Sequence, residues 1–293
     1  MFDEARFRDI RRTSMLWGYA NGWFPEYLTA DDDPLYAKLK FLLKHGFREM
    51  PLPLAEVVSM DEARRDQFGQ FLADHDLHVT PQVAYDYVCA DAEEAKRNQD
   101  YIAKGLRAHS PLLRNWSVFT MAGAGRRFDR NLAPEEKLRR LSERLAPLAA
   151  VCHDLGTPLA INNQGDFYMA DFVALCESTP HLYLHVDTSN IFWAGEPIFP
   201  AFELAAPFTV GTHWRDEICV LGSRQPRGVM LENCVTGEGD VPLRRCFDVL
   251  REKAPDPNRL VMELELFPPT GVDRLDAIDA AVSYLRTLPG VEL

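Results

Sequence analysis

The sequence of 293 residues has no long apolar run. No stretch approaches the roughly 18 consecutive apolar residues that would span a bilayer. The N-terminal segment 1–8 is charged and lacks the apolar centre of a secretion signal. We therefore expect a soluble, cytoplasmic protein with no membrane partner.

A surplus of positive charge is also missing. Asp and Glu number 44 against 32 Lys and Arg, which gives a formal net charge of −12. A surface of this sign repels phosphate backbones, so we expect no nucleic-acid partner. No C-x-x-C pair is present. The scattered cysteines are expected to be reduced and mostly buried: Cys89, Cys152, Cys176, Cys219, Cys234 and Cys246.

The glycine-rich G-x-G-x-x-G turn of dinucleotide-binding open sheets is absent after the first apolar run. Strand-like and helix-like segments nevertheless alternate along the whole chain. Strands are predicted at 13–19, 47–52, 77–83, 116–121, 158–162, 182–187, 208–213 and 260–263. Helices are predicted at 33–45, 61–76, 92–108, 134–155, 170–176, 198–204, 243–253 and 275–288. This alternation predicts a single (β/α)₈ TIM barrel domain over residues 1–293.

The last three predicted strands each end in a side chain that can bind a metal: Asp187, His213 and Glu263. In a parallel barrel, strand ends of this kind meet on the face that carries the active site. Carboxylates with one imidazole suit a divalent ion such as Mn²⁺, Mg²⁺, Co²⁺ or Zn²⁺, and we expect one ion per chain. Each residue alone could instead be a helix cap, a core histidine or an ion-pair partner. Their joint occurrence at three successive strand ends favours the metal site.

Five short motifs in the second half resemble the xylose-isomerase-like barrel superfamily of sugar-phosphate isomerases and epimerases. In the family's order they are Leu159–Gly165, Val186–Asn190, Thr212–Asp216, Gly237–Val241 and Val261–Glu265.

The resemblance implies four metal ligands, a Glu, an Asp, a His and a Glu on strands five to eight. Asp187, His213 and Glu263 match the last three. The first position falls on Asn162, which can still offer its amide oxygen to a hard cation.

The resemblance also implies proton abstraction next to the carbonyl of a sugar, keto-sugar or cyclitol, assisted by the metal. Glu263 or Glu265 is the expected base, and Arg215 is expected to bind a polar group of the substrate. Further substrate contacts are expected near the same strand ends: Trp17, Asn163, Gln164, His185 and Trp214.

Asn162 changes the expected chemistry, because an amide cannot act as a base. The family moves the proton between two carboxylates, of which only Glu263 would remain here. One-base isomerisation or elimination is then favoured over epimerisation. The loss of one carboxylate also leaves a roughly neutral metal site and should weaken binding of the ion. Asp166 could supply a carboxylate from the following loop.

Other functions remain open on the sequence alone. A keto-sugar or inosose dehydratase would use the same site. A barrel that has lost the full metal site could only bind carbohydrate. An abasic-site endonuclease shares the barrel but needs further histidines at strand ends, and the net charge of −12 disfavours it. The expected partner is a small sugar or keto-sugar, and a homo-oligomer is compatible with the sequence.

Overall fold

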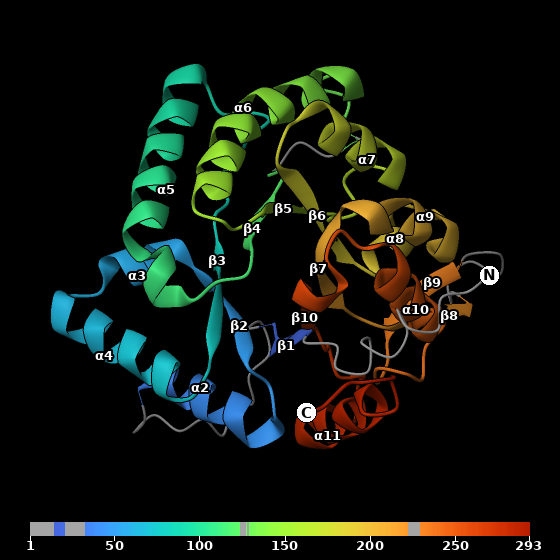
Figure 1. Cartoon of the computed structure of the whole chain (residues 1–293). Helices are drawn as coiled ribbons and strands as arrows, with labels where there is room; N and C mark the ends of the chain where they lie inside the picture. The colour runs from blue at the N-terminus through green and yellow to red at the C-terminus, as the bar shows by residue number, and fades with distance from the viewer. Residues whose placement is uncertain (1–14, 21–32, 124–126, 128, 222–228) are drawn as a thin grey trace, which may run out of the picture.

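Eight parallel strands close into a barrel in the order β1-β10-β7-β6-β5-β4-β3-β2, as Figure 1 shows. The computed structural model describes residues 15–20, 33–123, 127, 129–221 and 229–293. The strands are β1 (Leu16–Tyr19), β2 (Glu49–Pro53), β3 (His78–Gln82), β4 (Val118–Met121), β5 (Leu159–Asn162), β6 (Leu182–Asp187), β7 (Thr209–Trp214) and β10 (Val261–Leu264). The predicted TIM barrel is confirmed, and positions 13 and 14 of the first predicted strand lie outside the described residues.

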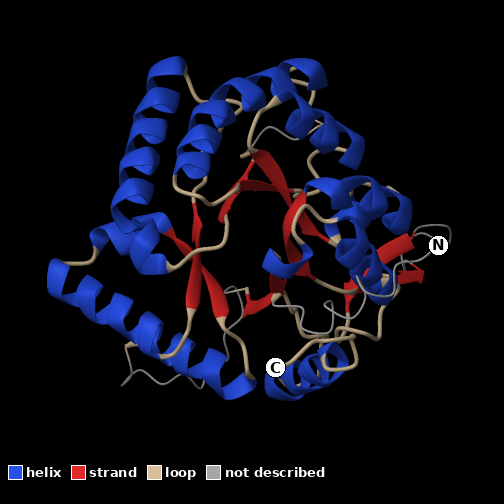
Figure 2. Ribbon diagram, in the orientation of Figure 1, coloured by secondary structure: helices blue, strands red, loops and turns tan. Residues whose placement is uncertain are grey.

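Helices surround the barrel (Figure 2). They are α2 (Pro34–His45), α3 (Leu54–Ser59), α4 (Glu62–Asp74), α5 (Ala92–Leu113), α6 (Pro134–Asp154), α7 (Met169–Ser178), α8 (Asn190–Trp193), α9 (Ile198–Ala205), α10 (Leu243–Lys253) and α11 (Arg274–Leu285). Two 3₁₀ turns cover Ala206–Phe208 and Pro257–Arg259. The eight predicted helices are present, and α3 and α8 are additional. None of the described helices combines the length and the apolar character needed to cross a membrane.

Aspartates fix the starts of four helices. The carboxylates of Asp33, Asp61, Asp91 and Asp273 accept backbone N–H groups from the first turns of α2, α4, α5 and α11. These side chains satisfy donors that a helix start leaves unpaired. They therefore fix the residues at which these four helices begin.

The barrel register places five positions side by side near the strand ends. Asp187 pairs with His213, His213 with Glu263, Glu263 with Gly18, and Gly18 with Glu49. Because side chains alternate across a strand, these positions share the inner face of the sheet. The row therefore crosses five strands inside the barrel, and four of its five positions carry titratable groups.

An antiparallel hairpin, not predicted from the sequence, follows β7. It consists of β8 (Glu217–Leu221) and β9 (Val229–Asn233), and it lies beside the barrel in Figure 1. The Asp216 carboxylate anchors both this hairpin and the loop after it. It accepts backbone N–H groups from Glu217, Gly237, Gly239 and Val241.

Candidate active site at the barrel mouth

A cavity of about 840 Å³ opens where β5, β6, β7 and β10 end. The hairpin contributes Leu231 to its wall, and the loop after β10 contributes Phe267. Most of the other lining side chains are polar or charged: Gln164, Asp187, Asn190, Arg215, Glu217, Glu232, Asn233 and Glu265. Four residues expected from the sequence to form the site, Gln164, Asp187, Arg215 and Glu265, are therefore brought together here.

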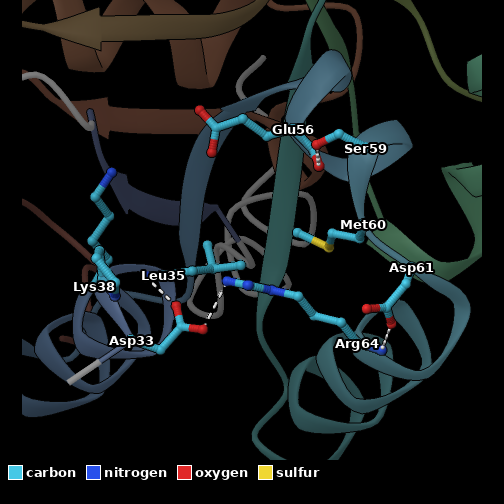
Figure 3. A pocket seen from close by; sticks show the side chains of 9 residues that line it. Asp33, Leu35, Lys38, Glu56, Ser59, Met60, Asp61 and Arg64 are labelled. Carbon is cyan, nitrogen blue, oxygen red and sulfur yellow. Dashed lines mark hydrogen bonds and ion pairs between the residues drawn. The ribbon is translucent and has the colours of Figure 1, made fainter. Parts of the chain in front are cut away.

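A smaller cavity of about 390 Å³ lies between α2, α3 and α4, as Figure 3 shows. Three of its charged groups already have structural partners. Asp33 caps α2 and pairs with Arg64 at 2.7 Å, and Asp61 caps α4. We place the chemistry at the barrel mouth, where buried titratable groups approach one another beside a larger cavity.

His213 lies at the centre of those groups, next to the residues that line the mouth cavity. Its Nε2 is 3.1 Å from Oε2 of Glu263. Its Nδ1 is 3.9 Å from Oδ2 of Asp187 and 3.7 Å from Oε2 of Glu265. The three metal ligands expected with most support from the sequence are thus adjacent. The two carboxylates, however, lie at opposite nitrogens of the imidazole.

Within the described residues, two groups of side chains have ligand atoms close enough to hold a metal ion. The deep group is His185, His213 and Glu263, and the mouth group is Asp187, His213 and Glu265. In each group the ligand atoms lie within 4.8 Å of one another. All members of the deep group are buried, whereas Glu265 is partly exposed.

The deep group contains polar atoms without hydrogen bonds. Both ring nitrogens of His185, both of His213 and both carboxylate oxygens of Glu263 have no partner of hydrogen-bond geometry. Buried polar atoms in this state are costly and rare in native proteins. Two imidazoles and a carboxylate are a common ligand set for divalent transition metals. These residues therefore fit a metal ion.

Asp187 is held rigidly at the end of β6. Its Oδ1 accepts the backbone N–H groups of Ser189 and Asn190 at 2.8 and 2.9 Å, so it forms the turn that the sequence also allowed. Asn163 hydrogen-bonds both backbone groups of Asp187 through its side-chain amide. Asn163 is thus a positioning residue, and Oδ2 of Asp187 remains directed towards His213.

Burial and mutual charge shift the titration of this cluster. Burial raises the pKa of Asp187 to about 7, with Glu265 adding to the effect and Arg215 and His213 opposing it. Burial lowers the pKa of His213, but the carboxylates of Glu265, Glu263 and Asp187 outweigh it and raise the pKa to about 9. Burial also raises the pKa of Glu263. The cluster therefore favours a bound positive charge. In the absence of metal, this charge is the proton on His213.

The strand-five position does not supply a free ligand group. The Asn162 amide donates to the backbone oxygen of His185 at 2.9 Å, and its Oδ1 accepts from Nε2 of Gln164. Oδ1 of Asp166 accepts the backbone N–H of Gln164 at 3.0 Å, and Asp166 belongs to neither the deep nor the mouth group. Both side chains thus take part in local hydrogen bonds at the end of β5.

Arg215 lies in the cavity wall in a defined orientation. Its guanidinium pairs with Glu217 and lies 3.9 Å from Oδ2 of Asp187. It also lies over the ring of Phe267, 4.5 Å from the centroid. Glu217 in turn accepts Nε1 of Trp193 at 3.0 Å. Sequence reasoning missed Glu217, because the alternating segment that contains it was not assigned to a strand.

Two residues expected to contact substrate, Trp17 and Trp214, do not line the mouth cavity. Their side chains are buried, with 4% and 0% exposure, and their rings meet edge to face at 6.3 Å. They lie next in sequence to the inward-facing positions 18 and 213, so strand alternation turns them towards the helices. Trp193 on α8 lines the cavity instead and is 53% exposed.

His185, also expected to contact substrate, does not line the mouth cavity either. His185 lies two residues before Asp187, one layer deeper in the barrel, and is fully buried. Burial lowers its pKa well below the usual value, and the charge on His213 adds to this. Glu49 is buried in the same interior, where its Oε1 accepts the backbone N–H of Thr80 at 3.1 Å.

The chain belongs to the xylose isomerase-like TIM barrel family, whose profile matches residues 39–288. This confirms the resemblance found in the sequence. Among solved structures, D-psicose 3-epimerase with D-fructose is similar at a TM-score of 0.72 and 15% identity, over 94% of this chain and 100% of that one.

Two further structures share the fold. The IolI protein with a bound zinc atom has a TM-score of 0.66 at 15% identity, over 92% of this chain and 96% of that one. The probable 3-DHS dehydratase AsbF from Bacillus anthracis has a TM-score of 0.64 at 14% identity, over 92% of this chain and 98% of that one. At these identities the similarity shows only that the fold is shared. A search of curated proteins finds no match.

Proposed function

We propose that the protein is a divalent-metal-dependent isomerase or epimerase of a sugar or sugar phosphate. The observation that carries the proposal is that residues lining the mouth cavity lie next to the buried cluster around His213. Asp187 and Glu265 line the cavity and also approach His213 within 3.9 Å. The similarity to D-psicose 3-epimerase and to a zinc-containing barrel supports this reading.

His213 and Glu263 would hold the ion, because both belong to the set expected from the sequence and to the deep group. Asp187 adds negative charge beside them. A divalent ion supplies Lewis acidity, and its charge at this site would act on the cavity through His213, whose other ring nitrogen faces Asp187 and Glu265. The unpartnered ring nitrogens and carboxylate oxygens are the donor atoms that such an ion requires.

Glu265 is the better placed of the two expected bases. It lines the cavity with a side chain that is 20% exposed, whereas Glu263 is completely buried. The Glu265 carboxylate can therefore meet a C–H group of a substrate and take its proton. His213, whose Nδ1 is 3.7 Å away, can stabilise the carboxylate charge.

Arg215 and Gln164 would orient the substrate. Both line the cavity, and the Arg215 guanidinium is fixed by Glu217 before any substrate arrives. A guanidinium held in this way offers donors to a hydroxyl, carbonyl or phosphate oxygen. Trp193 presents an apolar indole face in the same wall, which suits the C–H face of a sugar.

The test is turnover by metal-loaded protein on a panel of ketoses, aldoses, inososes and their phosphates. We expect turnover that chelation abolishes and that Glu265→Gln lowers by at least about 100-fold with metal content retained. Glu203→Gln is the control. It removes a carboxylate on α9 that pairs with Lys253 on α10, and turnover by this variant should be near wild type. Undiminished turnover by chelated protein or by the Glu265→Gln variant would overturn the proposal.

Product analysis separates isomerisation from loss of water. A dehydratase is the second candidate, because elimination also needs only one base on the carbonyl side. Asn162, with both ends of its amide engaged, favours these two outcomes over a two-base epimerisation.

A further inference from the structure

His185 is a buried imidazole that neither the family pattern nor ordinary core packing explains. Its Nε2 lies 3.9 Å from Oε2 of Glu263, and its ring centroid is 4.7 Å from that of His213. The ring of Phe119 covers it edge-on at 5.0 Å. Neither ring nitrogen has a partner of hydrogen-bond geometry. A residue that served only to fill the core would normally be apolar here.

The neighbouring strand makes room for this ring. Gly211 on β7 is the register partner of His185, and a Cβ at position 211 would overlap Nδ1 of the imidazole. The Nδ1 edge is therefore packed against the β7 backbone. The opposite edge, with Nε2, is directed towards Glu263.

We propose that His185 is a ligand of the metal ion, which is held by Nε2 of His185, Nε2 of His213 and the Glu263 carboxylate. The inference rests on the metal of the proposed function and identifies the ligand that Asn162 does not supply. The separations of 3.1 and 3.9 Å from Oε2 of Glu263 match those between ligands that share one ion about 2 Å from each.

The carboxylates at the other side of His213 fit this arrangement. Oδ2 of Asp187 and Oε2 of Glu265 lie 3.9 and 3.7 Å from Nδ1. A proton on Nδ1 directed at these carboxylates leaves the lone pair on Nε2, on the side of the deep group. In carboxylate–histidine–metal arrangements a hydrogen bond from the imidazole to the carboxylate fixes the tautomer. At 3.7 and 3.9 Å, Glu265 and Asp187 would favour a proton on Nδ1 through their charge alone. Asp187 and Glu265 then act as orienting and substrate-facing groups.

The decisive measurement counts imidazoles around the bound ion. X-ray absorption of the zinc-loaded protein should show two imidazole ligands, whereas the set expected from the sequence has one. In His185→Gln the count should fall to one, and zinc affinity, measured by chelator competition, should fall by at least about 100-fold. The metal-free melting temperature of each variant reports whether the fold is retained.

Three further variants sharpen the test. Gly211→Ala should displace the ring and weaken zinc binding by about tenfold or more, without removing a ligand. Asn162→Ala should change zinc affinity by less than about threefold. His153→Ala removes an exposed histidine on α6 and controls for non-specific binding.

The possible failures can be told apart. One imidazole in the wild type, or unchanged affinity in His185→Gln, would overturn the role of His185 and leave the proposed function standing. A loss of affinity in Asn162→Ala as large as in His185→Gln would also contradict the ligand set. If the wild type binds none of Zn²⁺, Co²⁺, Mn²⁺ and Mg²⁺, both the ligand and the metal-dependent function are wrong.

Discussion

Nε2 of His213 lies 3.1 Å from Oε2 of Glu263 inside the barrel, and the two atoms form no hydrogen bond. The two residues are direct register partners on β7 and β10. Their separation is short for an unpaired contact and normal for two ligands of one ion. The buried cluster below the mouth cavity therefore fits a cation, and the predictions below test whether one binds there and what it does.

The metal-free protein should lose stability as the pH rises from about 7 to 9. The pKa of His213 is raised to about 9 in the folded chain, from an ordinary value of 6.5. The folded state therefore holds an extra proton in this interval. Its stabilisation is fully present below pH 6.5 and is lost as the pH rises through 9, by on the order of 3 kcal/mol. This loss is measured as the free energy of unfolding in urea at several pH values, with chelator present.

The control for this prediction is His213→Gln, which cannot bind the proton. The stability of this variant should depend much less on pH between 7 and 9. Both proteins are compared with Asp187→Asn added, because the pKa of Asp187, raised to about 7, is held down by His213 and would move to higher pH in its absence. Equal slopes above pH 7 would contradict the assignment to His213.

Metal preference follows from the donor atoms. Two imidazoles and a carboxylate should bind Zn²⁺ and Co²⁺ at least about 100-fold more tightly than Mg²⁺, which prefers oxygen ligands. Competition titrations at fixed pH give the ratio. Mg²⁺ binding as tightly as Zn²⁺ would point to a site formed by oxygen ligands.

Replacement of Arg215 should affect the substrate more than the metal. Arg215→Ala removes the guanidinium from the cavity wall and should raise KM by at least about tenfold. Arg215→Lys keeps the charge but loses the geometry shared with Glu217, so a smaller increase is expected. Metal affinity should change by less than about threefold. Unchanged KM in Arg215→Ala would remove Arg215 from the substrate site.

The tryptophans should separate into one that senses substrate and two that stabilise the core. Trp193→Phe should abolish any fluorescence change on sugar binding, because Trp193 lines the cavity. Trp17→Phe should retain it. Trp17→Ala should cost about 3–5 kcal/mol of stability, as expected for a buried aromatic ring. A sugar response that is lost in Trp17→Phe and kept in Trp193→Phe would reverse these roles.

Much of the fold could be read from the sequence. Apolar runs alternating with amphipathic segments gave all eight barrel strands, and the position of Asp187, His213 and Glu263 at strand ends brought them together as expected. These features depend on local pattern and on the topology of a parallel barrel.

Other parts of the site depend on contacts that a sequence does not display. The orientation of Trp17 and Trp214 follows from a one-residue alternation, so proximity to the mouth was misleading. The depth of His185 follows from barrel register, and the space for it comes from Gly211 on the next strand. The hairpin that contains Glu217 was missed because its two strands form a separate antiparallel sheet, outside the alternation of strands and helices that identified the barrel.

Solvent-deuterium incorporation tests the central claim most directly. The metal-loaded protein is incubated in D₂O with each substrate that it turns over, and the products are read by NMR. One-base chemistry by Glu265 predicts deuterium at the carbon next to the carbonyl, in an isomerised or dehydrated product, with little C3 epimer. Turnover without deuterium at that carbon would contradict proton abstraction, and efficient C3 epimerisation would contradict the single base.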